Sequence, residues 1–379
     1  MPRIHPRDIW QARKTNKALL ALLPACRDLE AARSELRWLQ QHAVAVSQQT
    51  GHSRQSSLLA RFIRRRACGE PLQYVLGSEY FGALEIRCRP GVLIPRPETA
   101  ASTSHLAHIA SSQLKPNAGE MNPIRVLDLC TGSGCIPLLF HHEFYSQEQN
   151  HGKQVELVGV DVSSDALSLA RENLIHQIAR EGMQYSPRSP RTKSLQSIGF
   201  VQADILKDDL DISEHNTGDG PLSLAQALAR LSDSSTPTFD ILTCNPPYIS
   251  PRSFRITTSR SVRQHEPIQA LVPATNDTEA MTDDEIGDLF YPKLLSLAEQ
   301  LEAKVVLFEV ADMEQAQRVA AMAVSQGAWS GVEIWRDEPA AGSTVDSVQI
   351  DLHNVAVRGV GHGRSVVAYS RKAAEQVAP

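Results

Sequence analysis

Several features are scarce in this sequence of 379 residues, and each scarcity excludes a class of protein. Aromatic residues make up only 5%, which argues against a long base-stacking surface for single-stranded nucleic acid. The 38 basic residues are outnumbered by 43 acidic ones, giving a net charge of −5, so binding of nucleic acid mainly by counterion release is not expected. No apolar run approaches the roughly 18 residues of a membrane-spanning helix. The sequence therefore predicts neither a stable nucleic-acid partner nor a membrane anchor.

Metal-binding and disulfide patterns are also missing. The cysteines form no CxxC pair and have no zinc-ligand spacing, so no metal site is predicted. Scattered cysteines in a chain of this length are typical of free thiols in a reducing compartment. Their positions are Cys26, Cys68, Cys88, Cys130, Cys135 and Cys244. What remains is an ordinary globular composition, with 42% hydrophobic and 21% charged residues.

The N-terminal part of the sequence predicts a small helical domain, residues 1–78. Apolar residues recur at helical spacing around Leu19, over residues 27–46 and over residues 58–63. An arginine run at residues 64–66 ends the third segment, where cations complement the helix dipole, and Gly69 follows as a stop signal. The run is typical of a solvated helix end, and it also fits a partner-binding face.

From residue 79 onward the sequence pattern changes to β structure. A β-hairpin linker is predicted at residues 79–100, ending in the segment IPRPET, whose two prolines stiffen a loop. Residues 101–379 then alternate apolar strands with helical segments, which predicts an α/β domain with a mostly parallel sheet and helices on both faces. The strand segments are 124–129, 155–160, 200–203, 239–243, 305–310, 332–335 and 365–369. Three polar stretches, about 185–199, 211–237 and 339–354, predict mobile surface insertions.

A glycine-rich turn follows the strand at 124–129. Asp128 lies just before it, and Gly132 and Gly134 allow the backbone to approach a ligand closely. The next strand ends in Asp161, an acid placed to accept hydrogen bonds from ribose hydroxyls. The pattern indicates an adenosine-containing cofactor, either a nicotinamide dinucleotide or S-adenosylmethionine. Pro137 stands where the dinucleotide fingerprint requires a third glycine, which makes a nicotinamide dinucleotide the less favoured of the two cofactors.

A further acid, Asp204, ends the third strand. Its carboxylate could accept a hydrogen bond from an adenine amino group, while the adjacent Ile205 packs on the ring. A local capping role explains Asp204 equally well.

The motif that decides between these interpretations is Asn245-Pro246-Pro247-Tyr248, at the end of the strand 239–243. Ligands of open parallel sheets lie at the carboxyl ends of the strands. The Asn245 side-chain carbonyl and the Pro246 backbone carbonyl could accept both hydrogens of a planar –NH2 group, and Tyr248 could pack on its plane. The motif therefore predicts a site for an amide or an exocyclic amine.

Together these motifs resemble those of the HemK/PrmC family of S-adenosylmethionine-dependent methyltransferases. The matching segments are DLCTGSG at 128–134, VD at 160–161, NPPY at 245–248, IPRPET at 94–99, GEPLQYVLG at 69–77, YFG at 80–82 and HEPIQAL at 265–271. NPPY alone is shared with methyltransferases of DNA adenine, whereas its combination with IPRPET and GEPLQYVLG is much more specific. The resemblance covers most of residues 57–369, except the three insertions.

The resemblance implies a class I methyltransferase fold, a Rossmann-like sheet of seven mostly parallel strands with an antiparallel last strand. It implies transfer of a methyl group to the side-chain nitrogen, N5, of the glutamine in the GGQ motif of a peptide-chain release factor. The cofactor-binding positions are then Asp128, Cys130, Thr131, Gly132, Ser133, Gly134, Asp161, Asp204, Ile205 and Asn245. The catalytic and substrate-binding positions are Asn245, Pro246, Pro247 and Tyr248, joined by Arg96 and Pro97 for substrate.

The resemblance also bears on partners and location. The N-terminal helices are expected to dock the release factor, and the chain is expected to be a monomer. The first 17 residues hold five basic side chains and one acid, which fits a mitochondrial presequence and, equally, a basic first helix. Bacterial and mitochondrial relatives carry such an N-terminal domain and cytosolic eukaryotic ones generally lack it. The mitochondrial matrix is therefore expected, with the cytoplasm as the alternative.

Two competing functions stay open at this point. An adenine-N6 nucleic-acid methyltransferase explains NPPY equally well, but it predicts a basic target-recognition domain, and the net charge of −5 favours a protein substrate. A binding protein that has lost turnover is the second alternative. The intact Gly132, Asp161, Asn245 and Tyr248 argue against it.

Overall fold

The computed structural model describes residues 4–51, 55–113, 123–207, 220–231, 238–274, 281–342 and 345–370. The chain forms two compact units. The first unit comprises Met1–Glu79, Cys88–Ile94 and Thr257–Pro267, and the second comprises Tyr80–Arg87, Pro95–Ile256 and Ile268–Pro379. The sequence did not indicate that residues 257–267 belong with the helical unit.

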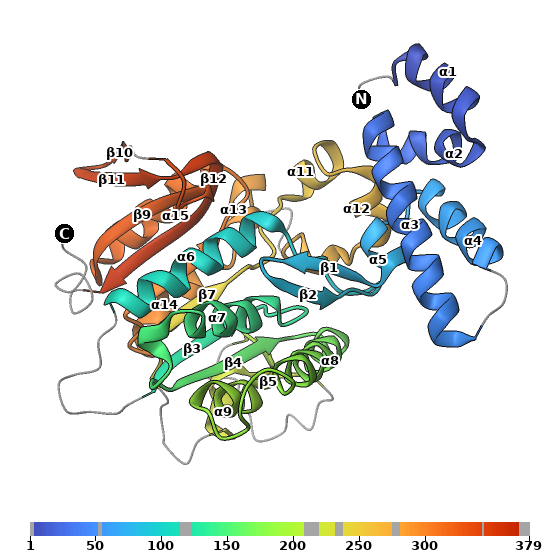
Figure 1. Ribbon diagram of the computed structural model, residues 1–379. Coiled ribbons are helices and arrows are strands. Elements are labelled where there is room, and N and C mark those ends of the chain that lie inside the picture. The colour runs from blue at the N-terminus through green and yellow to red at the C-terminus, as the bar shows by residue number, and fades with distance from the viewer. Residues whose placement is uncertain are drawn as a thin grey trace. The chain divides into compact units, whose positions relative to one another are not determined.

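The first unit is helical, as the apolar spacing predicts. Its helices are α1 (Pro6–Thr15), α2 (Lys17–Cys26), α3 (Leu29–Thr50), α4 (Gln55–Ala67), α5 (Leu72–Leu76) and α12 (Arg260–His265) (Figure 1). Leu22, Leu39 and Phe62 are among the residues that form its buried core. Asp28 caps α3 by accepting the backbone N–H of Ala31 at 2.7 Å, which satisfies one of the free donors at a helix start.

A ten-stranded sheet forms the centre of the second unit (Figure 1). The strand order is β10-β11-β9-β12-β8-β7-β3-β4-β5-β6. The strands are β3 (Ile124–Leu129), β4 (Val155–Asp161), β5 (Gly199–Asp204), β6 (Leu222–Ser223), β7 (Ile241–Cys244), β8 (Val305–Glu309), β9 (Trp329–Glu338), β10 (Asp346–Ile350), β11 (His353–Arg358) and β12 (Val360–Ser370). β12 runs antiparallel to β8 and β9, and β10 runs antiparallel to β11. The seven predicted strands are present, and β6, β10 and β11 extend the sheet beyond them.

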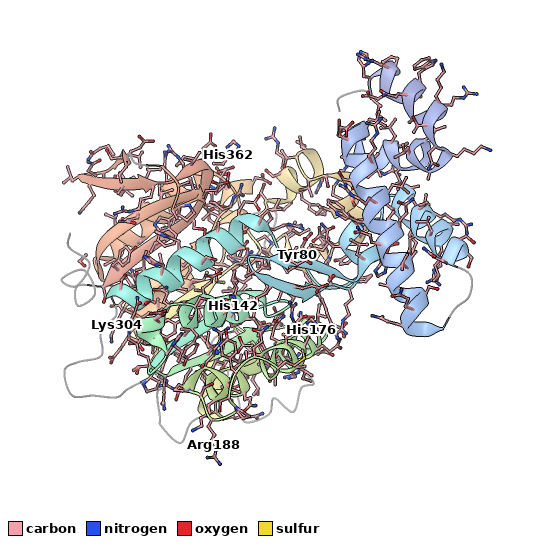
Figure 2. The ribbon with its side chains drawn as sticks, viewed as in Figure 1. Tyr80, His142, His176, Arg188, Lys304 and His362 are labelled. Carbon is pink, nitrogen blue, oxygen red and sulfur yellow. The ribbon has the colours of Figure 1, made fainter. Side chains whose placement is uncertain are left out.

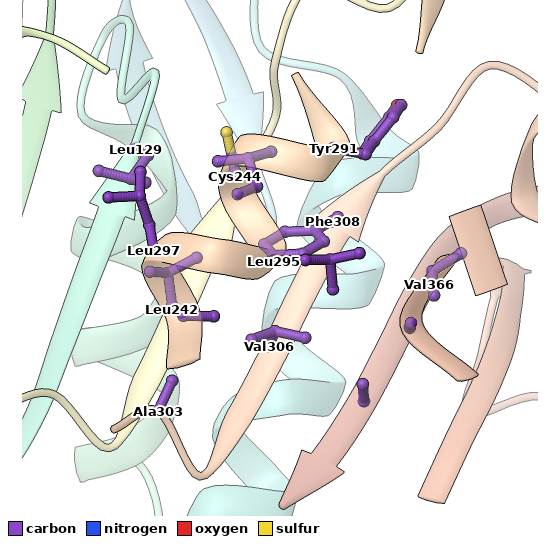
Figure 3. Close-up of a cluster of buried hydrophobic side chains, with 14 of the residues drawn as sticks. Leu129, Leu242, Cys244, Tyr291, Leu295, Leu297, Ala303, Val306, Phe308 and Val366 are labelled. Atoms are coloured by element: carbon purple, nitrogen blue, oxygen red, sulfur yellow. The ribbon is translucent and has the colours of Figure 1, made fainter. Parts of the chain in front are cut away.

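Helices cover both faces of this sheet, as the alternation of strands and helices predicts. One buried cluster joins a strand face to α6 (Pro97–Gln113), α7 (Cys135–Tyr145), α8 (Ser164–Glu181) and α9 (Pro190–Gln196). The other joins the opposite face to α10 (Leu224–Ala229), α14 (Tyr291–Gln300) and α15 (Met313–Gln326), and Figure 3 shows Leu242, Val306 and Phe308 within it. Neighbouring residues alternate between the layers, since Val126 belongs to the first and Leu127 to the second.

Shorter elements complete the second unit and its edges. They are the 3-10 turns η1 (Glu148–Asn150) and η2 (Ile268–Ala270), and the helices α11 (Pro251–Ile256) and α13 (Asp283–Gly287). A two-stranded hairpin, β1 (Ser78–Phe81) and β2 (Leu84–Arg87), is shorter than the predicted linker at 79–100. Pro97 to Thr99 of the IPRPET segment already belong to the first turn of α6, where proline is well tolerated because its missing N–H is not needed.

Parts of the polar stretches predicted to be mobile insertions form helices and strands. Residues 185–199 contain α9, whose Arg191 and Leu195 are buried, while Arg188 points outward in Figure 2. Arg191 is accommodated because Glu181 pairs with its guanidinium at 2.6 Å. In the stretch 339–354, residues 346–350 form β10 and His353 opens β11. Of residues 211–237, only 220–231 are described, and they form β6 and α10.

Candidate functional site

The glycine-rich turn lies between β3 and α7. Gly132 and Gly134 have φ values of 55° and 75°, a left-handed conformation that favours glycine. A Cβ atom on Gly134 would lie 2.9 Å from Cζ of Phe200 and 3.0 Å from Cβ of Ala170, so a side chain is excluded there. A Cβ atom on Gly132 would meet nothing within 4 Å. The turn is therefore packed tightly on one side and open on the other.

Asp161, at the end of β4, holds this turn in place. Its Oδ2 accepts the backbone N–H of Gly132 at 2.8 Å, and its Oδ1 accepts the backbone N–H of Ser163 at 2.9 Å. Burial raises the pKa of Asp161, while these backbone N–H groups act in the opposite direction. Each carboxylate oxygen retains a second lone pair, so Asp161 can still accept hydrogen bonds from vicinal hydroxyls.

Asp128 connects the glycine-rich turn to the neighbouring strand β7. Its side chain is fully buried, and its Oδ1 accepts the Thr243 hydroxyl at 2.7 Å. Burial raises the pKa of Asp128 to about 7, against the opposing effect of the Thr131 and Thr243 hydroxyls. Asp128 thus fixes the ends of two strands rather than presenting a charge to solvent.

The segment Asn245–Tyr248 leaves the sheet beside the glycine-rich turn. Leu129 and Cys244, the last residues of β3 and β7, are partners in the parallel register. Cys130 and Asn245 therefore begin neighbouring loops at the same edge of the sheet. Pro246 and Pro247 are buried, and Asn245 is half-buried. The structure brings the segment predicted to recognise an amide next to the glycine-rich turn predicted to bind the cofactor, as expected from the carboxyl ends of adjacent parallel strands.

A small cavity lies beside Asn245, and its walls also include Thr99 at the start of α6 and Glu309 at the end of β8. The Tyr248 hydroxyl donates to Oε1 of Glu309 at 3.0 Å. Burial and the neighbouring Glu309 raise the pKa of Tyr248 well above its usual range, while the positive charges of Arg364 and Arg96 act the other way. Arg96 precedes α6 directly and Pro97 is its first residue, so the two predicted substrate contacts flank this same region.

The other predicted cofactor positions are distributed around the turn. Ser133 is buried, and its backbone carbonyl accepts a hydrogen bond from Nδ2 of Asn173 at 2.9 Å. Asp204 and Ile205 stand at the end of β5, separated from β3 by β4. Oδ1 of Asp204 accepts the backbone N–H of Leu206 at 3.0 Å, which is the local capping role that the sequence left open. Ile205 is buried.

Sequence reasoning did not single out Thr243 and Glu309 as site residues. Both have a signal in the sequence, because each ends or nearly ends an apolar strand with a polar side chain, as Asp128 and Asp161 do. The site is thus a row of polar residues at the carboxyl ends of β4, β3, β7 and β8, which are consecutive neighbours in the sheet.

Comparison with known proteins identifies the family. The mitochondrial MRF1 N(5)-glutamine methyltransferase of Saccharomyces cerevisiae is 30% identical over 272 residues, covering 72% of this chain and 68% of that protein. The probable mitochondrial MRF1 N(5)-glutamine methyltransferase of Schizosaccharomyces pombe is 32% identical, covering 70% and 72%. The release factor glutamine methyltransferase of Haemophilus influenzae is 27% identical, covering 74% and 76%. No family model matches the chain.

The chain belongs to the release factor glutamine methyltransferase family. The predicted S-adenosylmethionine-dependent methyltransferase fold is confirmed by the mostly parallel sheet with antiparallel β12. Among solved structures, the N-terminal domain of human METTL16 in complex with SAH has a TM-score of 0.42 and 16% identity, covering 80% of this chain and 82% of that one.

The family's cofactor is S-adenosylmethionine, and the residues of this chain fit it. The side of the turn at Gly132 is open, and the Asp161 carboxylate beside it retains acceptor capacity for ribose hydroxyls.

Among the described helices, none is long and apolar enough to cross a membrane.

Proposed function

We propose that this chain methylates the side-chain amide nitrogen of the glutamine in the GGQ motif of a peptide-chain release factor. The relatives named for this activity support the proposal. The observation that carries it is the position of Asn245 and Pro246, next to the glycine-rich turn in the parallel register of β3 and β7. That register supports the proposal, because a segment suited to bind an amide lies beside a turn suited to bind the cofactor.

The chemistry asked of the chain is modest. An amide nitrogen is a poor nucleophile, because its lone pair is delocalised into the carbonyl group. The Asn245 side-chain carbonyl and the Pro246 backbone carbonyl accept the two N–H hydrogens, which orients the nitrogen and favours positive charge developing on it. Tyr248 packs on the amide plane. S-adenosylmethionine, when bound, supplies an electrophilic methyl group.

No general base of shifted pKa is needed for this arrangement. The nitrogen becomes acidic once it carries the methyl group, so its proton can leave to solvent after transfer. The two carbonyl acceptors, Asn245 and Pro246, would then have two roles, since they position the nitrogen and share the charge while the new bond forms.

The remaining proposals concern partners and location. We infer that the helical unit docks the release factor, that the enzyme acts as a monomer without a stable nucleic-acid partner, and that it works in the mitochondrial matrix. The two fungal relatives named as mitochondrial support that location, and the bacterial relative leaves the cytoplasm as the alternative. A fusion reporter is expected to co-localise with mitochondria, and a purely cytosolic signal would overturn the location.

One assay tests the function. Purified protein is incubated with methyl-labelled S-adenosylmethionine and, separately, with a mitochondrial-type release factor, DNA and RNA. Label is expected only in the release factor, and peptide mapping is expected to place it on the GGQ glutamine. The matched control is the same release factor with that glutamine replaced by alanine, which should stay unlabelled. Labelling of adenine in DNA or RNA would instead establish the competing nucleic-acid activity.

A further inference from the structure

One buried acid at the site has no role in the mechanism above. Glu309 ends β8, is only 5% exposed and lines the cavity beside Asn245. Its Oε1 accepts the Tyr248 hydroxyl at 3.0 Å, and its Oε2 accepts the hydroxyl of Thr99. Its backbone carbonyl accepts the hydroxyl of Tyr291 at 2.8 Å. All four residues belong to the second unit.

Burying a carboxylate is costly unless it is paired or hydrogen-bonded. The groups that compensate Glu309 therefore indicate which parts of the site it holds together. Burial raises the pKa of Glu309, and the nearby Glu98 acts in the same direction. The Thr99 and Tyr248 hydroxyls and the charge of Arg364 act in the opposite direction. Two of these compensating groups lie in the predicted substrate motifs, Thr99 in IPRPET and Tyr248 in NPPY.

Tyr248 is held at both ends by the same surroundings. Its hydroxyl binds Glu309, and its backbone carbonyl accepts Nε2 of Gln315 at 3.3 Å. Gln315 is itself buried and also donates to the carbonyl of Gly287 at 3.1 Å. A tyrosine fixed at its hydroxyl and at its backbone has its long axis set by those two contacts. The position of the ring is therefore set before any substrate arrives.

We propose that Glu309 is a positioning residue of the amide site, joining Tyr248 of the NPPY segment to Thr99 at the start of α6, which lines the cavity beside Asn245 together with Glu309. The inference rests on the proposed function, since it assigns the fixed position of the Tyr248 ring to packing on a primary amide. Glu309 acts through Tyr248 and Thr99 and does not touch the reacting atoms. Pre-orientation of this kind removes part of the entropic cost of reaching a reactive geometry.

The test separates positioning from stability by comparing kcat, KM and folding in matched variants. Glu309→Gln keeps the shape of the side chain but replaces one acceptor oxygen with a donor, so it cannot accept both hydroxyls. We expect kcat for release factor to fall about tenfold to a hundredfold, a range typical of small misplacements. The KM for release factor and the dissociation constant for S-adenosylmethionine are expected to stay within about threefold, because docking and cofactor contacts lie elsewhere.

Tyr248→Phe removes the other half of the hydrogen bond. Its kcat is expected to fall by a similar factor, and the double variant is expected to fall little further, because both changes break the same interaction. Multiplying effects in the double variant would overturn the proposal. Thr99→Val removes the hydrogen bond from the Thr99 hydroxyl to Glu309, so it tests the proposal even where Glu309→Gln folds poorly, and kcat should fall. Thr99→Ser keeps the hydroxyl, so its kcat should match that of the unsubstituted protein.

Glu181→Gln is the control for a buried acid away from the cavity, because Glu181 pairs with Arg191 between α8 and α9. It should lower the melting temperature without changing kcat. If Glu309→Gln behaves like Glu181→Gln, the role is structural and the proposal fails. If the unsubstituted protein methylates no release factor, the proposed function fails instead, so the two failures are distinguishable.

Discussion

The Thr243 hydroxyl donates a hydrogen bond to the buried carboxylate of Asp128 over 2.7 Å. This bond joins the carboxyl ends of two neighbouring strands, one leading to the glycine-rich turn and the other to Asn245. The glycine-rich turn and the Asn245–Tyr248 segment are therefore tied together at one edge of the sheet. Changes at Asp128 are expected to alter stability and its pH dependence, whereas changes at Asn245 are expected to alter turnover much more than stability.

The pH dependence of stability should carry the signature of Asp128. Its pKa rises from 3.8 to about 7 on folding, so between these values the folded state binds more protons than the unfolded state. Stability must then fall as pH rises through that window, by on the order of 4 kcal/mol over the full range. Asp128→Asn keeps an acceptor for Thr243 and does not titrate. Urea unfolding of both proteins at pH 4.5 and 7.5, without cofactor, should show a smaller decline for the variant, and equal declines would contradict the assignment.

Asn245→Ala should abolish methylation while cofactor binding largely survives. The substitution removes the side-chain carbonyl that orients the amide, and it leaves the Gly132–Asp161 contact untouched. Turnover is expected to fall on the order of 100-fold or more, measured by transfer of labelled methyl to release factor, with cofactor affinity followed by calorimetry. Asn354→Ala, an exposed asparagine on β11, is the matched control. Full activity of Asn245→Ala would disprove the mechanism.

Two glycine substitutions separate backbone strain from packing. Gly134→Ala combines a left-handed backbone with a contact of 2.9 Å to Phe200, and a loss of about 2–4 kcal/mol in unfolding free energy is expected. Gly132→Ala has the same strain but open space around the new methyl group, and a loss of about 1 kcal/mol is expected. Denaturant unfolding without cofactor measures both. Equal losses would show that the Phe200 contact is relieved freely.

The buried ion pair of α9 should contribute strongly to stability. Arg191→Met leaves the Glu181 carboxylate buried without its guanidinium partner, and the expected loss is about 3–5 kcal/mol. Arg188→Met, an exposed position in the same segment, should change stability by less than about 0.5 kcal/mol. The double variant Arg191→Met with Glu181→Leu should recover much of the loss. Equal stability of both single variants would mean that α9 contributes little to the fold.

The central strands and the motif positions could be predicted from sequence because their signals are local. The run 124–129 is apolar apart from Arg125 and Asp128 and forms β3 with the same bounds. Ser163 marks the start of the next helix, and its hydroxyl accepts the backbone N–H of Ala166 at 3.2 Å. The two loops, the glycine-rich turn after β3 and the proline-containing segment after β7, could likewise be predicted, because glycine and proline each constrain the backbone in a known way.

What could not be predicted depends on partners distant in the chain. Arg191 lies in a polar segment that favours a loop, and its pairing with Glu181 of α8 lets its side chain be buried. The hydroxyl of Ser261 donates to the carbonyl of Gly69 at 2.6 Å across 192 positions, which explains why residues 257–267 join the helical unit. Glu309 has the signal of an acid ending an apolar strand, but its hydrogen bonds to Thr99 and Tyr248 appear only in three dimensions.

The Asp128–Thr243 bond spans 115 positions, which has a consequence for biosynthesis. A growing chain completes β3, β4 and β5 long before β7 exists, so the glycine-rich turn is made before the Asn245–Tyr248 segment. Contacts of such large sequence separation form slowly, because the entropy of closing a long loop is lost before the contact contributes favourable free energy. The nascent protein therefore cannot form the site proposed for the substrate amide until the strand that precedes Asn245 has paired with β3.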